Sequence, residues 1–339
     1  MTRIYLAFDG GVAVLEKQRD RWIPQLELSG KHCQCLAVDP RRQERIYCGT
    51  FEAGLWQSDD AGANWETVPA ELPYPSVMSV AISRFQEPGG NRYLWAGTEP
   101  SAVFRSGDDC KSWLECSALD ELPSRHTWSF PPRPWTHHVR WIEPDPNSPG
   151  RIFVGIELGG VMRSLDNGET WEDRKPNSQH DCHTLRTYQG APGLVFEAAG
   201  GGFAESRDGG ESWRRFDEGL VHSYLWGLAA DPASPNTMIV SASPGPRAAH
   251  DDAHAEALLH RRVGDGPWKP VESGLPAPAG TRAYLLASHA GEPGVFYAVT
   301  RQEIYRSNNS GLSWERQDVA WPDNVDLTDV RSIVLAETD

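Results

Sequence analysis

The chain has 339 residues with 32 glycines, 26 prolines and 14 tryptophans, and 39% of its residues are apolar, a composition typical of many short strands joined by tight turns. Its formal charge of −15 and the absence of a dense lysine and arginine cluster in the sequence argue against a nucleic-acid partner. No apolar run approaches the ~20 residues that span a bilayer, and Met1 leads into a strand-like segment without a signal-peptide core, so we expect a cytoplasmic protein with no membrane partner.

A short motif recurs along the chain with constant internal spacing. It reads Ser-x-Asp-x-Gly-x-x-Trp, and complete copies begin at Ser58, Ser164 and Ser206. Near copies begin at Ser106, with Cys110 in place of Gly, and at Ser307, with Asn309 in place of Asp. An Asp or Asn side chain can cap a tight turn, Gly can supply a positive φ, and Trp can pack over the hairpin. The motif therefore predicts a repeated structural turn.

The tryptophans of this motif give the period of the repeat. Two decayed copies are recognisable by length, and the full series is Trp22, Trp65, Trp113, Trp171, Trp213, Trp268 and Trp314. Their mean spacing of about 49 residues is close to that of a four-stranded propeller blade. We expect Trp65, Trp171 and Trp213 to be packed residues remote from any ligand.

The motif resembles the Asp-box, or BNR repeat, of sialidases, sortilin-like receptors, xyloglucan-degrading hydrolases and a seven-bladed photosystem II assembly factor. The resemblance covers nearly the whole chain and implies an all-β, seven-bladed β-propeller that forms a single domain over residues 1–339. It is specific for fold and says little about activity, because one fold carries many functions.

The order of predicted strands shows how such a propeller would close. Blade two has strand-like runs at residues 33–38, 45–49, 54–58 and 64–68, with the inner strand first. The chain begins with a second strand, at residues 3–8, and its last run, at 331–336, is of the inner type. We therefore expect four strands in each blade and a C-terminal strand that completes the first blade and removes an open sheet edge.

Histidines are concentrated in the loops that such a propeller places on one face. We name the face at which the inner strands begin the upper face, and nine of the eleven histidines fall in its loops by this assignment. Alignment of the inner strands by their endings predicts that His32, His138, His183 and Tyr224 occupy one equivalent position, the first residue of the strand. Side chains at that position in neighbouring blades should converge near the central axis.

Acidic residues occupy the short loops between second and third strands on the same face, namely Asp9, Glu52, Glu99 and Glu157. Two imidazoles and a carboxylate suit Fe(II), Mn(II), Ni(II) or Zn(II). We therefore predict a divalent metal ion held by His138, His183 and Glu157, with His32 as a further ligand. The alternative is that these histidines form only a polar lining.

The six cysteines lack paired metal-ligand spacing, so we expect reduced, mostly buried thiols, with a thiolate ligand at Cys182 as the alternative. Two long segments, 117–136 and 243–255, are predicted to be insertions that cover the upper face. We expect them to form lids over a pocket, because long aromatic or proline-rich loops inside compact domains are commonly functional. His250 and His254 would share one face if the second insertion were helical, which would make them a second ligand pair.

These features favour a metal-dependent enzyme that acts on a small molecule at the upper face, as a monomer or weak homo-oligomer. The catalytic candidates are His222, Tyr224, Glu52 and Glu99. A sialidase-like glycoside hydrolase with a carboxylate pair from Glu52, Glu99 and Glu157 is one alternative. The chain lacks the Arg-Ile-Pro signature, however, and no carboxylate-binding triad can be matched to Arg140, Arg186, Arg282 and Arg331. The other alternative is a non-catalytic binding or assembly propeller whose acidic surface favours basic partners.

Overall fold

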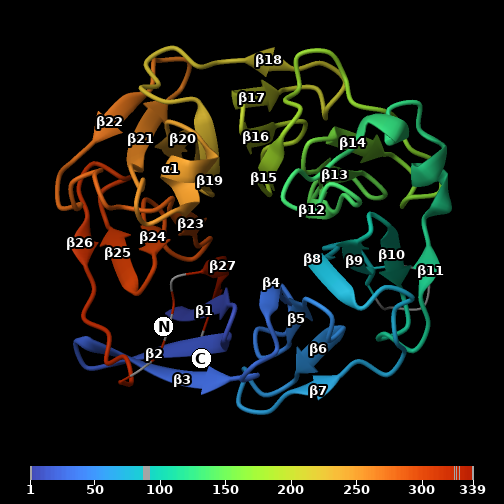
Figure 1. Ribbon diagram of the computed structural model, residues 1–339, viewed down its shortest axis with the longest axis horizontal. Helices are drawn as coiled ribbons and strands as arrows, with labels where there is room; N and C mark the ends of the chain where they lie inside the picture. The colour runs from blue at the N-terminus through green and yellow to red at the C-terminus, as the bar shows by residue number, and fades with distance from the viewer. Residues whose placement is uncertain (1, 87–91, 324, 326, 328, 338–339) are drawn as a thin grey trace.

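Seven antiparallel sheets surround a central axis in the computed structural model, which describes residues 2–86, 92–323, 325, 327 and 329–337 (Figure 1). This arrangement confirms the all-β, seven-bladed propeller. Blade one contains, from the axis outward, β27 (Val330–Glu337), β1 (Thr2–Phe8), β2 (Gly11–Gln18) and β3 (Arg21–Glu27). Among the described residues, no helix is long and apolar enough to cross a membrane.

The other blades follow in chain order, each with its first strand nearest the axis. Blade two contains β4 (Cys33–Val38), β5 (Ile46–Thr50), β6 (Leu55–Ser58) and β7 (Glu66–Thr67), and blade three contains β8 (Ser76–Ile82), β9 (Leu94–Glu99), β10 (Val103–Ser106) and β11 (Leu114–Glu115). Blade four contains β12 (Val139–Pro144), β13 (Ile152–Ile156) and β14 (Gly160–Ser164), and blade five contains β15 (Cys182–Thr187), β16 (Val195–Ala199), β17 (Gly202–Ser206) and β18 (Arg214–Arg215).

Blade six contains β19 (Tyr224–Asp231), β20 (Ser234–Ser243), β21 (Leu258–Val263) and β22 (Lys269–Val271), and blade seven contains β23 (Leu285–Ser288), β24 (Phe296–Thr300), β25 (Glu303–Ser307) and β26 (Glu315–Arg316). The two predicted insertions hold short helices. The first contains the 3-10 helices η1 (Ser117–Glu121) and η2 (Arg125–Thr127), and the second contains α1 (Pro246–His250).

Blade one closes the ring as the sequence predicts. β27 pairs antiparallel with β1, with Leu6 opposite Ile333 and Ile4 opposite Leu335. Because β1 also pairs with β2, its backbone is hydrogen-bonded on both sides. The core continues across this junction, since Ile4 and Phe8 pack in one apolar cluster with Tyr297 of blade seven.

Blade four departs from the prediction of four strands. Its sheet has three strands, and the fourth is reduced to a single bridge between Arg163 and Glu172. The Asp173 carboxylate caps the backbone N–H groups of Ser124 and Arg174, which diverts the chain after the bridge. Pro176 follows and lacks the N–H that a longer ladder would need.

Most inner strands contain a β-bulge, in which one strand has an extra residue relative to its partner. The register shifts between Val139 and Trp141 in β12 and between Cys182 and Thr184 in β15, so Arg140 and His183 are the extra residues there. The extra residues in the other bulged inner strands are Gln34 in β4, Met78 in β8, Trp226 with Gly227 in β19, and Arg331 in β27.

The repeated motif forms the same turn in all five copies. In the first, the Ser58 hydroxyl donates to Asp60 Oδ1 at 2.8 Å and accepts from the Gly62 N–H at 2.9 Å. Asp60 Oδ1 also accepts from the Asn64 N–H at 2.9 Å. The corresponding bonds recur in the turns that begin at Ser106, Ser164, Ser206 and Ser307. Cys110 replaces Gly at a φ of 60°, which shows that the turn tolerates the substitution.

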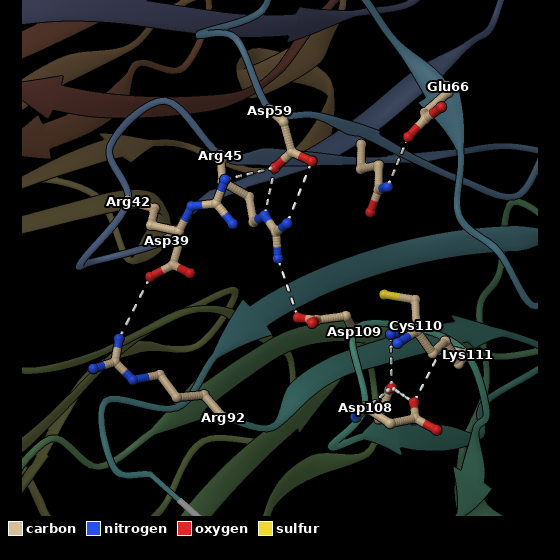
Figure 2. Close-up of polar contacts among 12 residues, drawn as sticks. Asp39, Arg42, Arg45, Asp59, Glu66, Arg92, Asp108, Asp109, Cys110 and Lys111 are labelled. Carbon is tan, nitrogen blue, oxygen red and sulfur yellow. Dashed lines mark hydrogen bonds and ion pairs between the residues drawn. The ribbon is translucent and has the colours of Figure 1, made fainter. Parts of the chain in front are cut away.

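These turns also connect neighbouring blades. In four of the turns, the backbone carbonyl of the third residue after the serine accepts a hydrogen bond from a side chain of the preceding blade. The donor and acceptor residues are Tyr5 and Ala61, Arg105 and Asn167, Arg163 and Gly209, and Arg261 and Ser310. Figure 2 shows the related contact between blades two and three. There Arg45 lies between Asp59 of its own blade, at 2.5 Å, and Asp109 of the next blade, at 3.1 Å.

Candidate functional site

Three ligand-type side chains meet where blades four and five adjoin. A carboxylate oxygen of Glu157, a carboxylate oxygen of Asp181 and a ring nitrogen of His183 all lie within 4.8 Å of one another. We name Glu157, Asp181 and His183 the carboxylate–histidine cluster. Glu157 lies in the loop between β13 and β14, Asp181 immediately precedes β15, and His183 is the bulge residue of β15.

The backbone of blade six requires that Nδ1 of the His183 ring carry a proton. Nδ1 of His183 lies 2.6 Å from the carbonyl oxygen of Leu225, and because a carbonyl can only accept, Nδ1 carries a proton. In the neutral ring Nε2 then presents a lone pair. This atom is fully buried, has no hydrogen-bond partner among the described residues and lies 3.4 Å from Asp181 Oδ2. A lone pair that faces carboxylates is a suitable ligand for a cation.

Glu157 is negatively charged in this environment. Burial alone would raise its pKa, but the hydrogen bond from His138 and the surrounding positive charges lower the pKa of Glu157 to about 2. His138 Nε2 lies 3.0 Å from Glu157 Oε2. Glu157 thus offers a carboxylate that is ionised near pH 7, one of whose oxygens is oriented by His138.

His138 lies between two carboxylates and does not belong to the three-residue cluster. Its Nδ1 is 3.5 Å from Glu99 Oε2, and its ring packs edge-on against Phe130 with centroids 4.7 Å apart. Arg133 donates from Nε to Glu99 Oε1 at 2.6 Å. Because Phe130 and Arg133 come from segment 117–136, that insertion covers His138, and the structure places His138 where it orients Glu157.

Asp181 was missed by the sequence analysis because of the bulges. His32, His138 and Tyr224 each lie two residues before the bulge residue of their inner strand. In blade five the bulge residue is His183, so the residue equivalent to these three is Asp181. The predicted equivalence of His183 with His32, His138 and Tyr224 was therefore wrong by two residues. The backbone N–H of Leu158 donates to Asp181 Oδ1 at 3.3 Å and helps to position it.

Aromatic residues of blade six form one wall of the site. The His183 ring lies 4.9 Å from Tyr224 and 4.7 Å from Trp226, between ring centroids. The Tyr224 hydroxyl is 3.4 Å from Nε2 of His250, which ends α1. Burial lowers the pKa of His250 to about 4, so this ring is neutral near pH 7. Tyr224 and His250 thus lie at the site, as does Trp226, which the sequence analysis did not single out.

The remaining predicted residues lie elsewhere. His32 has a φ of 50°, is exposed, and its Nδ1 lies 3.0 Å from Asp9. Glu52 is exposed as well. His222 is adjacent to Val221, whose N–H donates to His260 in the third strand of blade six, which places this segment away from the axis. His254 is exposed and bonded to Asp251, so it forms no ligand pair with His250.

A buried carboxyl group lies beside the cluster. Glu197 in β16 is fully buried, accepts the backbone N–H of Gln179 at 2.9 Å, and has one oxygen without a partner among the described residues. Burial raises the pKa of Glu197 to about 8. Burial also raises the pKa of the neighbouring Cys182 thiol, which disfavours a thiolate ligand there. All six cysteines are buried, as expected.

Two surface cavities are lined by residues outside the carboxylate–histidine cluster. Residues 174–180, the segment that leads into Asp181, line a cavity of about 500 Å³. A second cavity of about 430 Å³ lies on blade seven and includes Arg282, Arg301 and Arg316 in its lining.

No family model matches the chain. It is 25% identical over 183 residues to the oligoxyloglucan-reducing end-specific xyloglucanase of Emericella nidulans, a match that covers 48% of this chain and 21% of that protein. It is 22% identical over 177 residues to the probable enzyme of the same name from Neosartorya fischeri, which covers 46% of this chain and 20% of that protein. The match thus spans about a fifth of the length of these relatives.

Solved structures show the same fold. The GH74 xyloglucanase from Xanthomonas campestris matches with a TM-score of 0.69 at 18% identity, over 93% of this chain and 52% of that one. YCF48 bound to D1 peptide matches with a TM-score of 0.55 at 17% identity, over 84% and 80% of the two chains. The structural relatives therefore include both a glycoside hydrolase and a peptide-bound propeller.

Proposed function

We propose that the protein binds one divalent metal ion through Glu157, Asp181 and His183 and acts with it on a small molecule at the upper face. The observation that carries this proposal is the buried, unpartnered Nε2 of His183, held toward two carboxylates by its Nδ1 bond to Leu225. One imidazole and two carboxylates suit Fe(II), Mn(II), Ni(II) or Zn(II), and their two negative charges balance a divalent cation.

Such an ion would acidify bound water or polarise a carbonyl. His138 would keep Glu157 oriented through their 3.0 Å contact, and Leu225 would keep the His183 lone pair available. The Tyr224 hydroxyl, 3.4 Å from His250, would donate a hydrogen bond to a ligand rather than a proton, because burial raises the pKa of Tyr224. We also propose that the repeated turns belong to the Asp-box class, since all five share one set of hydrogen bonds.

The test is the metal content of untagged protein. We expect about one ion per chain in the wild type and near zero in His183→Ala and Asp181→Asn. Each variant removes one of the three proposed protein ligands, and the two that remain should bind the ion too weakly to retain it during purification. His32→Ala is the matched control, because His32 is exposed and should leave the metal content unchanged. Equal metal content in wild type and both cluster variants would contradict the proposal.

A glycoside hydrolase is the second candidate function. It is favoured by the two xyloglucanase relatives and by the neighbouring carboxylates of Glu157 and Asp181, because glycosidases commonly work with a pair of carboxyl groups. Release of reducing sugar from xyloglucan oligosaccharides, unaffected by a chelator and lost in Asp181→Asn, would favour this function over the metal-dependent one.

A further inference from the structure

Two arginines occupy the bulge positions of inner strands, one in blade four and one in blade one. Arg140 extends from β12 of blade four to β19 of blade six, where its guanidinium lies 4.5 Å from the centre of the Trp226 ring. The same ring is 4.7 Å from that of His183. Arg331 holds the equivalent bulge position in β27 of blade one. Arg140 therefore lies directly beside the proposed metal ligands.

Arg140 has no acceptor among the described residues. It donates no hydrogen bond and forms no ion pair in the described part of the chain, and its Nε is fully buried and unpartnered. A guanidinium carries five N–H donors, and leaving them unsatisfied in a partly buried position is unfavourable. Arg186 of the neighbouring blade is different, because it stacks on Trp141 at 4.6 Å and its Nε donates to the Leu228 carbonyl at 3.4 Å.

A second guanidinium group, that of Arg331, lies close enough to Arg140 to affect its pKa. Burial lowers the pKa of Arg140, the nearby Glu157 carboxylate raises it, and the nearby positive charge of Arg331 lowers it. Arg331 has Asp329 as its carboxylate partner, at 3.5 Å, and its side chain is 40% exposed. Two guanidinium groups, one of them without an acceptor in the described part of the chain, make a site for an anion.

We propose that Arg140 and Arg331 bind an oxyanion, a carboxylate or a phosphate group, of the small molecule on which the protein acts. This inference rests on the proposed function, because the oxyanion would place the rest of the ligand at the carboxylate–histidine cluster. The face of Trp226 holds the Arg140 guanidinium in place, so its donors are oriented before the ligand arrives.

The test is calorimetric titration of the protein with malonate, with phosphate and with neutral malonamide, in the presence and absence of Mn²⁺. We expect one of the two anions to bind and malonamide to bind at least tenfold more weakly, because charge-assisted bonds to guanidinium require an anion. Tighter binding of malonate would indicate that the small molecule is an organic acid, and tighter binding of phosphate would indicate that it is a phosphate ester. Equal affinity for malonamide would overturn the inference.

The variants separate this inference from the metal proposal. Arg140→Met and Arg331→Met should each weaken binding of the preferred anion about tenfold or more, while Mn²⁺ stoichiometry stays at the wild-type value. Arg186→Met, which alters a partnered arginine, should leave anion affinity unchanged. Unchanged affinity in Arg140→Met overturns the inference. If Arg140→Met does not fold, the anion affinity of Arg331→Met tests the inference instead, because Arg331 is at a more exposed position. Unchanged affinity in that variant would overturn the inference in the same way. Dependence on Arg140 in metal-free protein supports the anion site even where no metal binds.

Discussion

At the scale of single residues, the buried carboxyl of Glu197 makes the stability of the protein depend on pH. Its pKa is raised to about 8 by burial, so the folded state favours the protonated form. A group of this kind contributes its full stability below its ordinary pKa of 4.5 and loses it as the pH rises through 8. Charging Glu197 therefore opposes folding in the range from about pH 4.5 to pH 8.

We predict that Glu197→Gln will flatten this dependence. The amide oxygen can still accept the Gln179 N–H, and the variant cannot ionise. Relative to the wild type it should gain up to about 4 kcal/mol in unfolding free energy between pH 5 and pH 8. Urea denaturation at both pH values measures the change, with the exposed Glu315→Gln as control. Parallel pH profiles of wild type and Glu197→Gln would show that Glu197 is not the group responsible.

Two motif tryptophans should differ in their contribution to stability. Trp213 is buried at 6% exposure and packs with Phe153 and Val161 of blade four, whereas Trp171 is only partly buried and its Nε1 lacks a partner among the described residues. Trp213→Ala should lower the unfolding free energy by about 3 to 5 kcal/mol, and Trp171→Ala by about 2. Urea denaturation checks the order, and the metal content of the folded protein should stay constant.

The sequence predicted part of the candidate site at this scale. Glu157 and His183 were identified because the strand order assigns both to the upper face. Asp181 could not be placed correctly, because an alignment by strand endings does not reveal where a bulge inserts its extra residue. The triplet Asp181-Cys182-His183 was the available signal. Glu197 lies in a strand whose other residues are apolar, and its burial depends on packing between blades.

At the scale of elements, the hydrogen bonds from one blade to the next repeated turn hold neighbouring sheets together. Arg163 illustrates them, because it is 6% exposed and its Nη1 donates to the Gly209 carbonyl at 2.8 Å. It also pairs with Glu172, at 2.9 Å from Nε, in the blade that has only three strands. This arginine therefore supports both the junction of blades four and five and the reduced edge of blade four.

We predict that Arg163→Ala will destabilise the protein by about 2 to 3 kcal/mol, because a buried carbonyl loses a charged donor. Arg21→Ala is the matched control, since its ion pair with Asp318 is exposed and should contribute less than about 0.5 kcal/mol. Thermal or urea unfolding of both variants gives the comparison. Similar losses would indicate that these blade-to-blade contacts contribute little.

The strands themselves were predicted closely from the sequence. The inner strand of blade two was expected at residues 33–38 and lies there, and the later strands of that blade agree within two or three residues. These strand positions are predictable because the alternation of apolar residues and the fixed spacing of the turns depend on the local sequence alone. The fourth strand of blade four, which is reduced to a single bridge, was not predicted. Asp173 and Pro176 redirect the chain there, and the regular spacing of the tryptophans gives no sign of it.

At the scale of the whole molecule, the pairing of β1 with β27 is the contact that closes the ring. Removal of residues 330–337 would leave β1 without its inner neighbour and would expose the apolar junction that Ile333 helps to fill. We predict that the deleted protein will show no cooperative unfolding transition and will aggregate, because an open, long edge strand recruits other chains.

Circular dichroism during urea denaturation and size-exclusion chromatography measure these effects. The control is Glu337→Gln, whose exposed side chain lies at the end of the same strand. A deleted protein that unfolds cooperatively as a monomer would show that the other six blades and the remainder of the first are sufficient for a closed fold.

The β1–β27 pairing also sets the order of events during synthesis. Residues 2–8 are synthesised before their partner strand at 330–337, which is made more than 300 residues later. At about 5 to 20 residues per second, the wait is on the order of 15 to 65 s. Blade one must remain incomplete for that time while the later blades form behind it. A nascent chain stalled before residue 330 should therefore bind chaperones that recognise open strands.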